Sequence, residues 1–122
     1  MEKIQTFEQL IAWQKAQDIA VLIYKVTKEF PPDESYTLID QMRRAINSVS
    51  ANIAEGFGRK TPKDKLQFYN IAYGSLLEVK NYLYLAERLG YITNLSKDNF
   101  IDDVIDIQKL INALMRSVKN NV

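Results

Sequence analysis

Carboxylate and amide side chains interrupt two apolar stretches of this sequence, where carboxylates can perform acid–base or metal chemistry. Asn52 and Glu55 lie about one helical turn apart in the first stretch, and Ser75 and Glu78 lie in the second. Carboxylate metal sites in helical bundles also use Glu-x-x-His pairs, but this sequence has no histidine and no cysteine. We therefore expect no catalytic residue, metal site or cofactor. We interpret these four residues, together with Trp13, as structural polar residues.

Cationic side chains gather in the middle of the sequence, and such side chains can bind phosphate groups. Between residues 41 and 65, six cationic side chains face two carboxylates, a net charge of +4, whereas the whole chain carries +1. A solvated turn that only aids solubility is an equally good interpretation of residues 59–65. The candidate nucleic-acid-binding residues are Arg43, Arg44, Arg59, Lys60, Lys63 and Lys65.

The glycines of "EGFGRK" superficially resemble a phosphate-binding loop. They follow a predicted helix rather than a strand, and the Gly-Lys-Ser/Thr ending of that motif is missing. We therefore interpret them as part of a turn between two helices.

Four helices are predicted to position these residues, since no segment alternates with period two over the length of a strand. Start signals at Thr6, Thr61 and Ser96 and stop signals at Pro31 and Gly90 predict helices over 7–30, 36–56, 62–89 and 97–119. Leu95 and Phe100 are placed as a hydrophobic staple at the last helix start. We predict one all-α domain over residues 1–122, an antiparallel up-down-up-down four-helix bundle.

In two antiparallel helices joined by a short turn, residues that are equally far from the turn along the chain lie at the same height. This geometry places Trp13 beside residues 53 and 54 of the second helix. A buried indole N–H needs an acceptor, so we expect Trp13 to donate a hydrogen bond to Asn52 or Glu55.

The same geometry predicts two contacts between the second and third helices. Glu78 is expected to pair with Arg44, and Gly74 is expected beside Ala45, where the helices would approach closely. The third helix is apolar nearly all round, which indicates burial on several sides or a subunit interface.

The first residues, "MEKIQTFEQL", lack the apolar core of a signal peptide, and no run approaches the roughly 18 apolar residues of a membrane span. We therefore expect a cytoplasmic protein that makes no use of a membrane.

Residues 12–92 closely resemble the bacterial 23S rRNA intervening-sequence protein family. The typical motifs Q-x-R-R-A and S-x-x-A-N-I-A-E-G fall at residues 41–45 and 48–56. The motifs G-R-x-[ST], A-x-G-S-x-x-E and L-x-L-A-x-R-L-G-Y-I follow at 58–61, 72–78 and 83–92. One departure is Ser50, where a proline is common.

The resemblance implies a homopentamer of four-helix bundles arranged as a barrel. It also implies a link to the intervening sequences of 23S rRNA. Related accessory variability proteins of diversity-generating retroelements form similar rings, bind nucleic acid and partner a reverse transcriptase. Our leading hypothesis is a non-enzymatic, oligomeric protein that binds structured RNA. The alternative is a protein-interaction scaffold whose ring docks a partner such as a reverse transcriptase.

Overall fold

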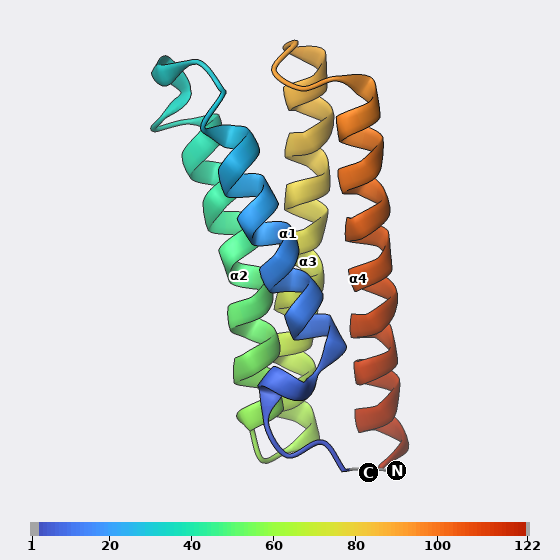
Figure 1. Cartoon of the computed structure of the whole chain (residues 1–122). Helices are drawn as coiled ribbons and strands as arrows, with labels where there is room; N and C mark the ends of the chain where they lie inside the picture. The colour runs from blue at the N-terminus through green and yellow to red at the C-terminus, as the bar shows by residue number, and fades with distance from the viewer. Residues whose placement is uncertain (1–2, 122) are drawn as a thin grey trace.

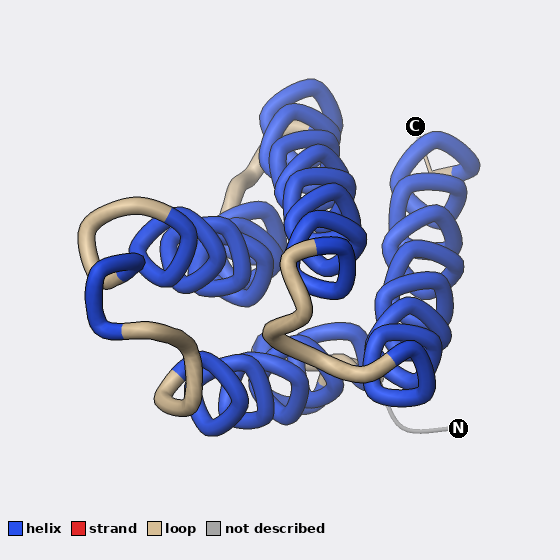
Figure 2. Tube along the Cα trace, turned by 90° about the horizontal axis from the view of Figure 1, so that it is seen from above, coloured by secondary structure: helices blue, strands red, loops and turns tan. Residues whose placement is uncertain are grey.

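The computed structural model describes residues 3–121, and its regular structure is entirely helical (Figure 1). The long helices are α1 (Ile11–Thr27), α2 (Leu38–Gly58), α3 (Pro62–Arg88) and α4 (Asn94–Asn120). Short 3-10 turns, η1 (Phe7–Gln9) and η2 (Pro32–Glu34), precede α1 and α2. Consecutive long helices run in opposite directions, and no strand occurs in residues 3–121 (Figure 2). The predicted all-α fold with four helices is confirmed.

The two ends of α3 follow their sequence signals. The Thr61 hydroxyl oxygen accepts a hydrogen bond from the Asp64 backbone N–H at 3.2 Å, and Pro62 occupies the first helical position. Gly90 follows the helix with a φ of 80°, a left-handed conformation that glycine adopts at little cost. Local side-chain chemistry is therefore sufficient to define this helix.

The first helix begins later than the sequence predicts. Thr6 and Gln9 form the expected capping box, and the Thr6 N–H donates to the Gln9 Oε1 at 3.1 Å. This box caps only η1, because Leu10 adopts extended backbone angles and separates η1 from α1. The second helix is also displaced, spanning 38–58 rather than 36–56.

The predicted start of the fourth helix at Ser96 is wrong. Thr93 is the capping residue, and its hydroxyl oxygen accepts from the Ser96 N–H at 3.0 Å. Leu95 is 71% exposed, so the expected staple with Phe100 does not form. Two hydroxyl residues stand three positions apart here, and the earlier one forms the cap.

Apolar stripes from all four helices meet in one core. Its central side chains are fully buried, so truncating one of them to alanine is expected to cost about 2–5 kcal/mol. The central side chains include Ile23, Met42, Ile46, Val49, Ile53, Leu76, Val79, Leu83, Val104 and Ile111.

Among the glycines of α2 and α3, Gly56 lies closest to the neighbouring helix. A Cβ atom added to Gly56 would lie 2.7 Å from Tyr69 Cε1 and 3.2 Å from Phe68 Cβ, so only glycine fits without a shift. A Cβ added to Gly74 would meet nothing within 4 Å among the described residues. The predicted close approach at Gly74 and Ala45 is therefore wrong, because Gly74 faces open space.

The α2–α3 turn, the N-terminal segment and the last turns of α4 lie at the same end of the bundle (Figure 1). The connections from α1 to α2 and from α3 to α4 lie at the opposite end. This arrangement brings the basic segment 59–65 close to Lys3 and Asn121, the first and last residues that the structure describes.

Candidate nucleic-acid interface

Exposed cations line the α2–α3 turn. Arg59, Lys60 and Lys63 are all exposed. Arg59 and Lys60 precede Thr61, the capping residue of α3, and Lys63 lies in the first turn of that helix. Arg59 makes an ion pair with Glu55 at 3.1 Å, and its guanidinium lies 4.6 Å from the centre of the Phe68 ring. Within residues 3–121, Lys60 and Lys63 make no ion pair. These two ammonium groups are free to meet an anion.

Lys65, although part of the same basic segment, turns back onto the protein. Its ammonium donates to the Phe57 carbonyl oxygen at 2.6 Å and to the Gly56 carbonyl oxygen at 3.4 Å. It also lies 5.4 Å from the centre of the Phe57 ring. Burial lowers the pKa of the Lys65 ammonium. Lys65 therefore stabilises the negative, C-terminal end of α2.

Arg43 binds the C-terminal end of α1, as Lys65 binds that of α2. Its Nε donates to Thr27 Oγ1 at 3.0 Å, and its Nη2 donates to the Tyr24 carbonyl oxygen at 3.3 Å. The guanidinium also stacks 4.5 Å from the centre of the Tyr24 ring. The Thr27 hydroxyl donates onward to the Ile23 carbonyl oxygen at 2.7 Å. Arg43 thus binds the last turn of the preceding helix.

Arg44 lies on the exposed side of α2 and pairs with Asp40 at 2.8 Å. Glu78 is also exposed and makes no ion pair with Arg44, so the predicted Glu78–Arg44 pair is wrong. Arg44 precedes Arg59 by fifteen positions, mostly along α2, about 22 Å at 1.5 Å per residue. The six candidate cations therefore fall into two groups, near opposite ends of the bundle.

Two serine side chains join α2 to its neighbours, and Asn52 bonds back to one of them within α2. Ser75 Oγ donates to Ser48 Oγ at 2.8 Å, and Asn52 Nδ2 donates to the Ser48 carbonyl oxygen at 2.7 Å. On the other side, Gln17 Nε2 donates to Ser50 Oγ at 3.0 Å. Sequence reasoning missed Ser48 and Ser50, although each lies between the apolar positions of α2. Their role is structural.

The expected hydrogen bond from Trp13 is wrong. In the part of the chain that the structure describes, the Trp13 indole N–H donates to neither Asn52 nor Glu55. Trp13 packs edge-on against Phe7, with ring centres 5.2 Å apart. It is only partly buried, so its N–H does not need a protein acceptor. Glu55 is instead the partner of Arg59.

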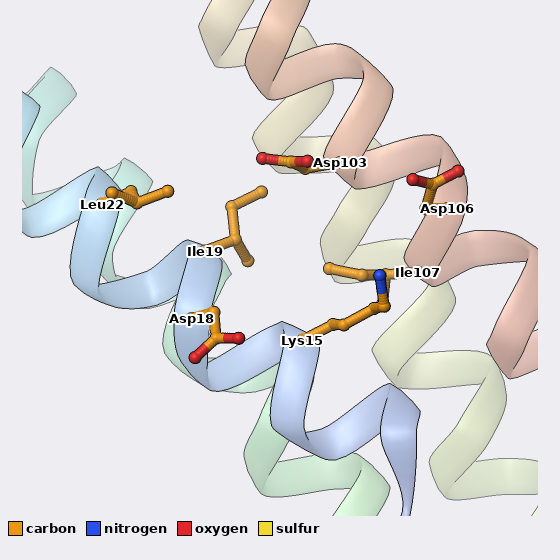
Figure 3. Close-up of a pocket in the computed structure, with 7 residues that line it drawn as sticks. All are labelled: Lys15, Asp18, Ile19, Leu22, Asp103, Asp106 and Ile107. Atoms are coloured by element: carbon orange, nitrogen blue, oxygen red, sulfur yellow. The ribbon is translucent and has the colours of Figure 1, made fainter.

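A small acidic groove of about 130 Å³ lies between α1 and α4 (Figure 3). Asp18, Asp103 and Asp106 line it beside Lys15. Burial, with the nearby Asp106 carboxylate, raises the pKa of Asp103. Among residues 3–121, no group of three or more histidine, cysteine, aspartate or glutamate side chains is arranged to hold a metal ion. The groove therefore adds negative charge to a face that lies away from the basic turn, the α2–α3 turn with Arg59, Lys60 and Lys63.

None of the helices in residues 3–121 combines the length and apolar character of a bilayer-spanning segment.

The fold and the basic turn define an all-α protein of four helices with a cationic end. A family model described as 23S rRNA-intervening sequence protein matches residues 8–113, so the chain belongs to this family. It is also similar to a crystal structure from Bacteroides thetaiotaomicron, described as a protein with unknown function from the S23 ribosomal protein family. The two are 25% identical with a TM-score of 0.80, over 87% of this chain and 96% of that chain. A comparison with curated proteins finds no match.

Proposed function

We propose that this protein binds structured RNA, without catalysis, through the exposed cations of the α2–α3 turn. The observation that carries the proposal is the exposure of Arg59, Lys60 and Lys63 on one short segment, with Lys60 and Lys63 making no ion pair within residues 3–121. The family description, which refers to a 23S rRNA intervening sequence, supports RNA as the nucleic acid.

The chemistry of such a turn favours the phosphate backbone over the bases. Ammonium and guanidinium groups neutralise phosphates and release counterions, so the affinity falls steeply as salt rises. Folded RNA presents closely spaced phosphates and 2′-hydroxyls that are recognised mostly by shape. Arg43 and Lys65 are left out of this proposed interface, because both are already bound to helix ends.

We also propose that the chain assembles as a homopentameric barrel, as its family resemblance implies. Support comes from the outer side of α3, where five large apolar side chains are 42–50% exposed in the single chain. Exposed apolar side chains gathered on one helix favour contact with a second copy. Assembly would repeat the basic turn around a ring and strengthen its field. The five are Ile71, Leu77, Tyr84, Leu85 and Leu89.

Light scattering on the purified protein tests the assembly. The proposal requires a mass about five times the 14.1 kDa of one chain. A uniform 14.1 kDa species at micromolar concentration would contradict it.

Filter binding to a structured RNA tests the interface. Arg59→Ala/Lys60→Ala/Lys63→Ala should weaken binding more than tenfold at low salt, since about three phosphate contacts are lost per chain. The control is Lys25→Ala/Lys28→Ala/Arg44→Ala, which removes the same charge from exposed positions towards the other end of the bundle. Equal loss in both variants, or no binding by the unmodified protein, would contradict the proposed interface.

The second candidate function is a scaffold that docks a partner protein, such as a reverse transcriptase. The exposed apolar side chains of α3, among them Leu77 and Leu85, also support this candidate. A pentamer whose RNA affinity is unchanged by the triple substitution in the turn would favour the scaffold.

A further inference from the structure

A cavity of about 520 Å³ opens at the end of the bundle, and part of the basic segment 59–65 borders it. It lies where the N-terminal segment, the start of α3 and the last turns of α4 meet. Its walls are mainly apolar, and they come from elements far apart in the sequence. Leu10, Phe57, Tyr69, Leu114 and Val118 form these walls.

Among the described residues, the charged side chains that border this cavity are all cationic. Lys3, Lys60 and Lys65 line it, and among the described residues that line it there is no aspartate or glutamate. Ser117 and Asn121 add a hydroxyl and an amide. An apolar cavity with a cationic border complements a molecule that has an apolar body and an anionic group.

Lys65 connects the border to the interior. Two of its ammonium hydrogens have acceptors in the Gly56 and Phe57 carbonyl oxygens. An ammonium group has three donors, so one remains for a ligand. Burial lowers the pKa of Lys65, and an anion in the cavity would counter this desolvation.

The size and lining of this cavity are those of a small-molecule site. Ligand sites commonly enclose roughly 300–1,000 Å³ and combine apolar walls with a few polar groups. The groove between α1 and α4 is smaller, about 130 Å³, and is lined by three aspartates, so it does not suit an anion.

We propose that this cavity binds a small organic anion with an alkyl body, such as a medium-chain carboxylate or an alkyl phosphate. The alkyl chain lies between Leu10, Tyr69 and Leu114, and the anionic group meets Lys60 and Lys65. Lys60 belongs to both this site and the proposed RNA interface, but the test below contains no RNA, so either proposal can fail without the other.

Ligand-detected NMR on the full chain, with octanoate, octyl phosphate and octylammonium as probes, tests the proposal. The two anions should show saturable binding, and the stronger of them identifies the preferred headgroup. Octylammonium, which has the same alkyl chain and the opposite charge, should bind at least about tenfold more weakly. Equal binding of all three probes, or no binding of either anion, would overturn the proposal.

Three variants locate the bound anion. Lys60→Gln should weaken binding about two- to fivefold, whereas Lys63→Gln should not, because Lys63 is exposed on the same turn but does not line the cavity. Val118→Trp places a large ring in the wall of the cavity and should abolish binding, with folding verified by circular dichroism. Should Val118→Trp fail to fold, the Lys60/Lys63 pair decides, and equal effects in those two variants would overturn the proposal.

Discussion

The Lys65 ammonium nitrogen lies 2.6 Å from the Phe57 carbonyl oxygen, so a side chain in the first turn of α3 closes the end of α2. The C-terminal end of a helix leaves carbonyl groups without intrahelical partners, and a cation there also interacts favourably with the negative end of the helix dipole. The turn that carries the proposed phosphate contacts is therefore fixed by a lysine that does not take part in them.

Lys65→Met should lower the free energy of unfolding by about 1–2 kcal/mol, because the charge-assisted hydrogen bonds are lost. Lys63→Met removes the same charge from an exposed site and should change the free energy of unfolding by less than about 0.5 kcal/mol. Urea denaturation followed by circular dichroism measures both values. Equal effects would mean that Lys65 does not stabilise the end of α2.

Gly56→Ala and Gly74→Ala should act in opposite directions. The first places a Cβ 2.7 Å from the ring of Tyr69, which is 2% exposed, and 3.2 Å from the Cβ of Phe68. We expect a loss of about 1–3 kcal/mol. The Cβ of Gly74→Ala meets no atom within 4 Å among residues 3–121. This substitution should raise the free energy of unfolding by about 0.5–1 kcal/mol, because alanine has the higher helix propensity.

Thermal and urea unfolding of both glycine variants provide the measurement. A stabilised Gly56→Ala would contradict the close approach of α2 to α3. If Gly74→Ala is instead destabilised and dissociates, the face of α3 around residue 74 is closely covered by another copy.

Tyr69 should make the protein sensitive to alkali. Burial raises the pKa of its hydroxyl to about 12, whereas the unfolded chain has a value of about 10. Between these values the unfolded state ionises first, so this contribution to stability is complete below pH 10 and lost as pH rises towards 12. The loss should be about 2 kcal/mol.

Tyr69→Phe is the matched control, because no described hydrogen bond involves the Tyr69 hydroxyl and the ring is kept. Urea denaturation at pH 9 and at pH 11.5 should show a smaller decline in stability for this variant than for the unmodified protein. Identical declines would rule out Tyr69 as the titrating group.

The hydrogen bond between Ser48 and Ser75, 2.8 Å long, should couple α2 to α3. In a double-mutant cycle with alanine at both positions, the coupling free energy should be about 0.5–1.5 kcal/mol. Additive effects of the two single substitutions would show that the bond contributes nothing to stability.

The number of helices and the ends of α3 were predictable because their signals are local. Thr61, Pro62 and Gly90 act on backbone groups within one turn of themselves. The predicted hydrogen bond from Trp13 to Asn52 or Glu55 and the predicted Glu78–Arg44 pair are wrong, because equal height along two helices does not set their rotation about the axis. Glu78 and Arg44 are both exposed and do not meet.

The separate roles of the basic residues could not be read from their positions in the sequence. Arg43 and Lys65 bind carbonyl oxygens, and backbone acceptors leave no sequence pattern that distinguishes such a cation from an exposed one. Lys60, Lys63 and Lys65 look alike in the string "RKTPKDK", yet only Lys65 turns inward.

The salt dependence of RNA affinity decides whether the α2–α3 turn binds phosphate. For the unmodified protein, log K should fall linearly with log salt concentration. For Arg59→Ala/Lys60→Ala/Lys63→Ala, the slope should be shallower by roughly two units for each chain that contacts the RNA. A slope that is unchanged by the triple substitution, measured by filter binding over the same salt range, would contradict the claim that this turn binds phosphate.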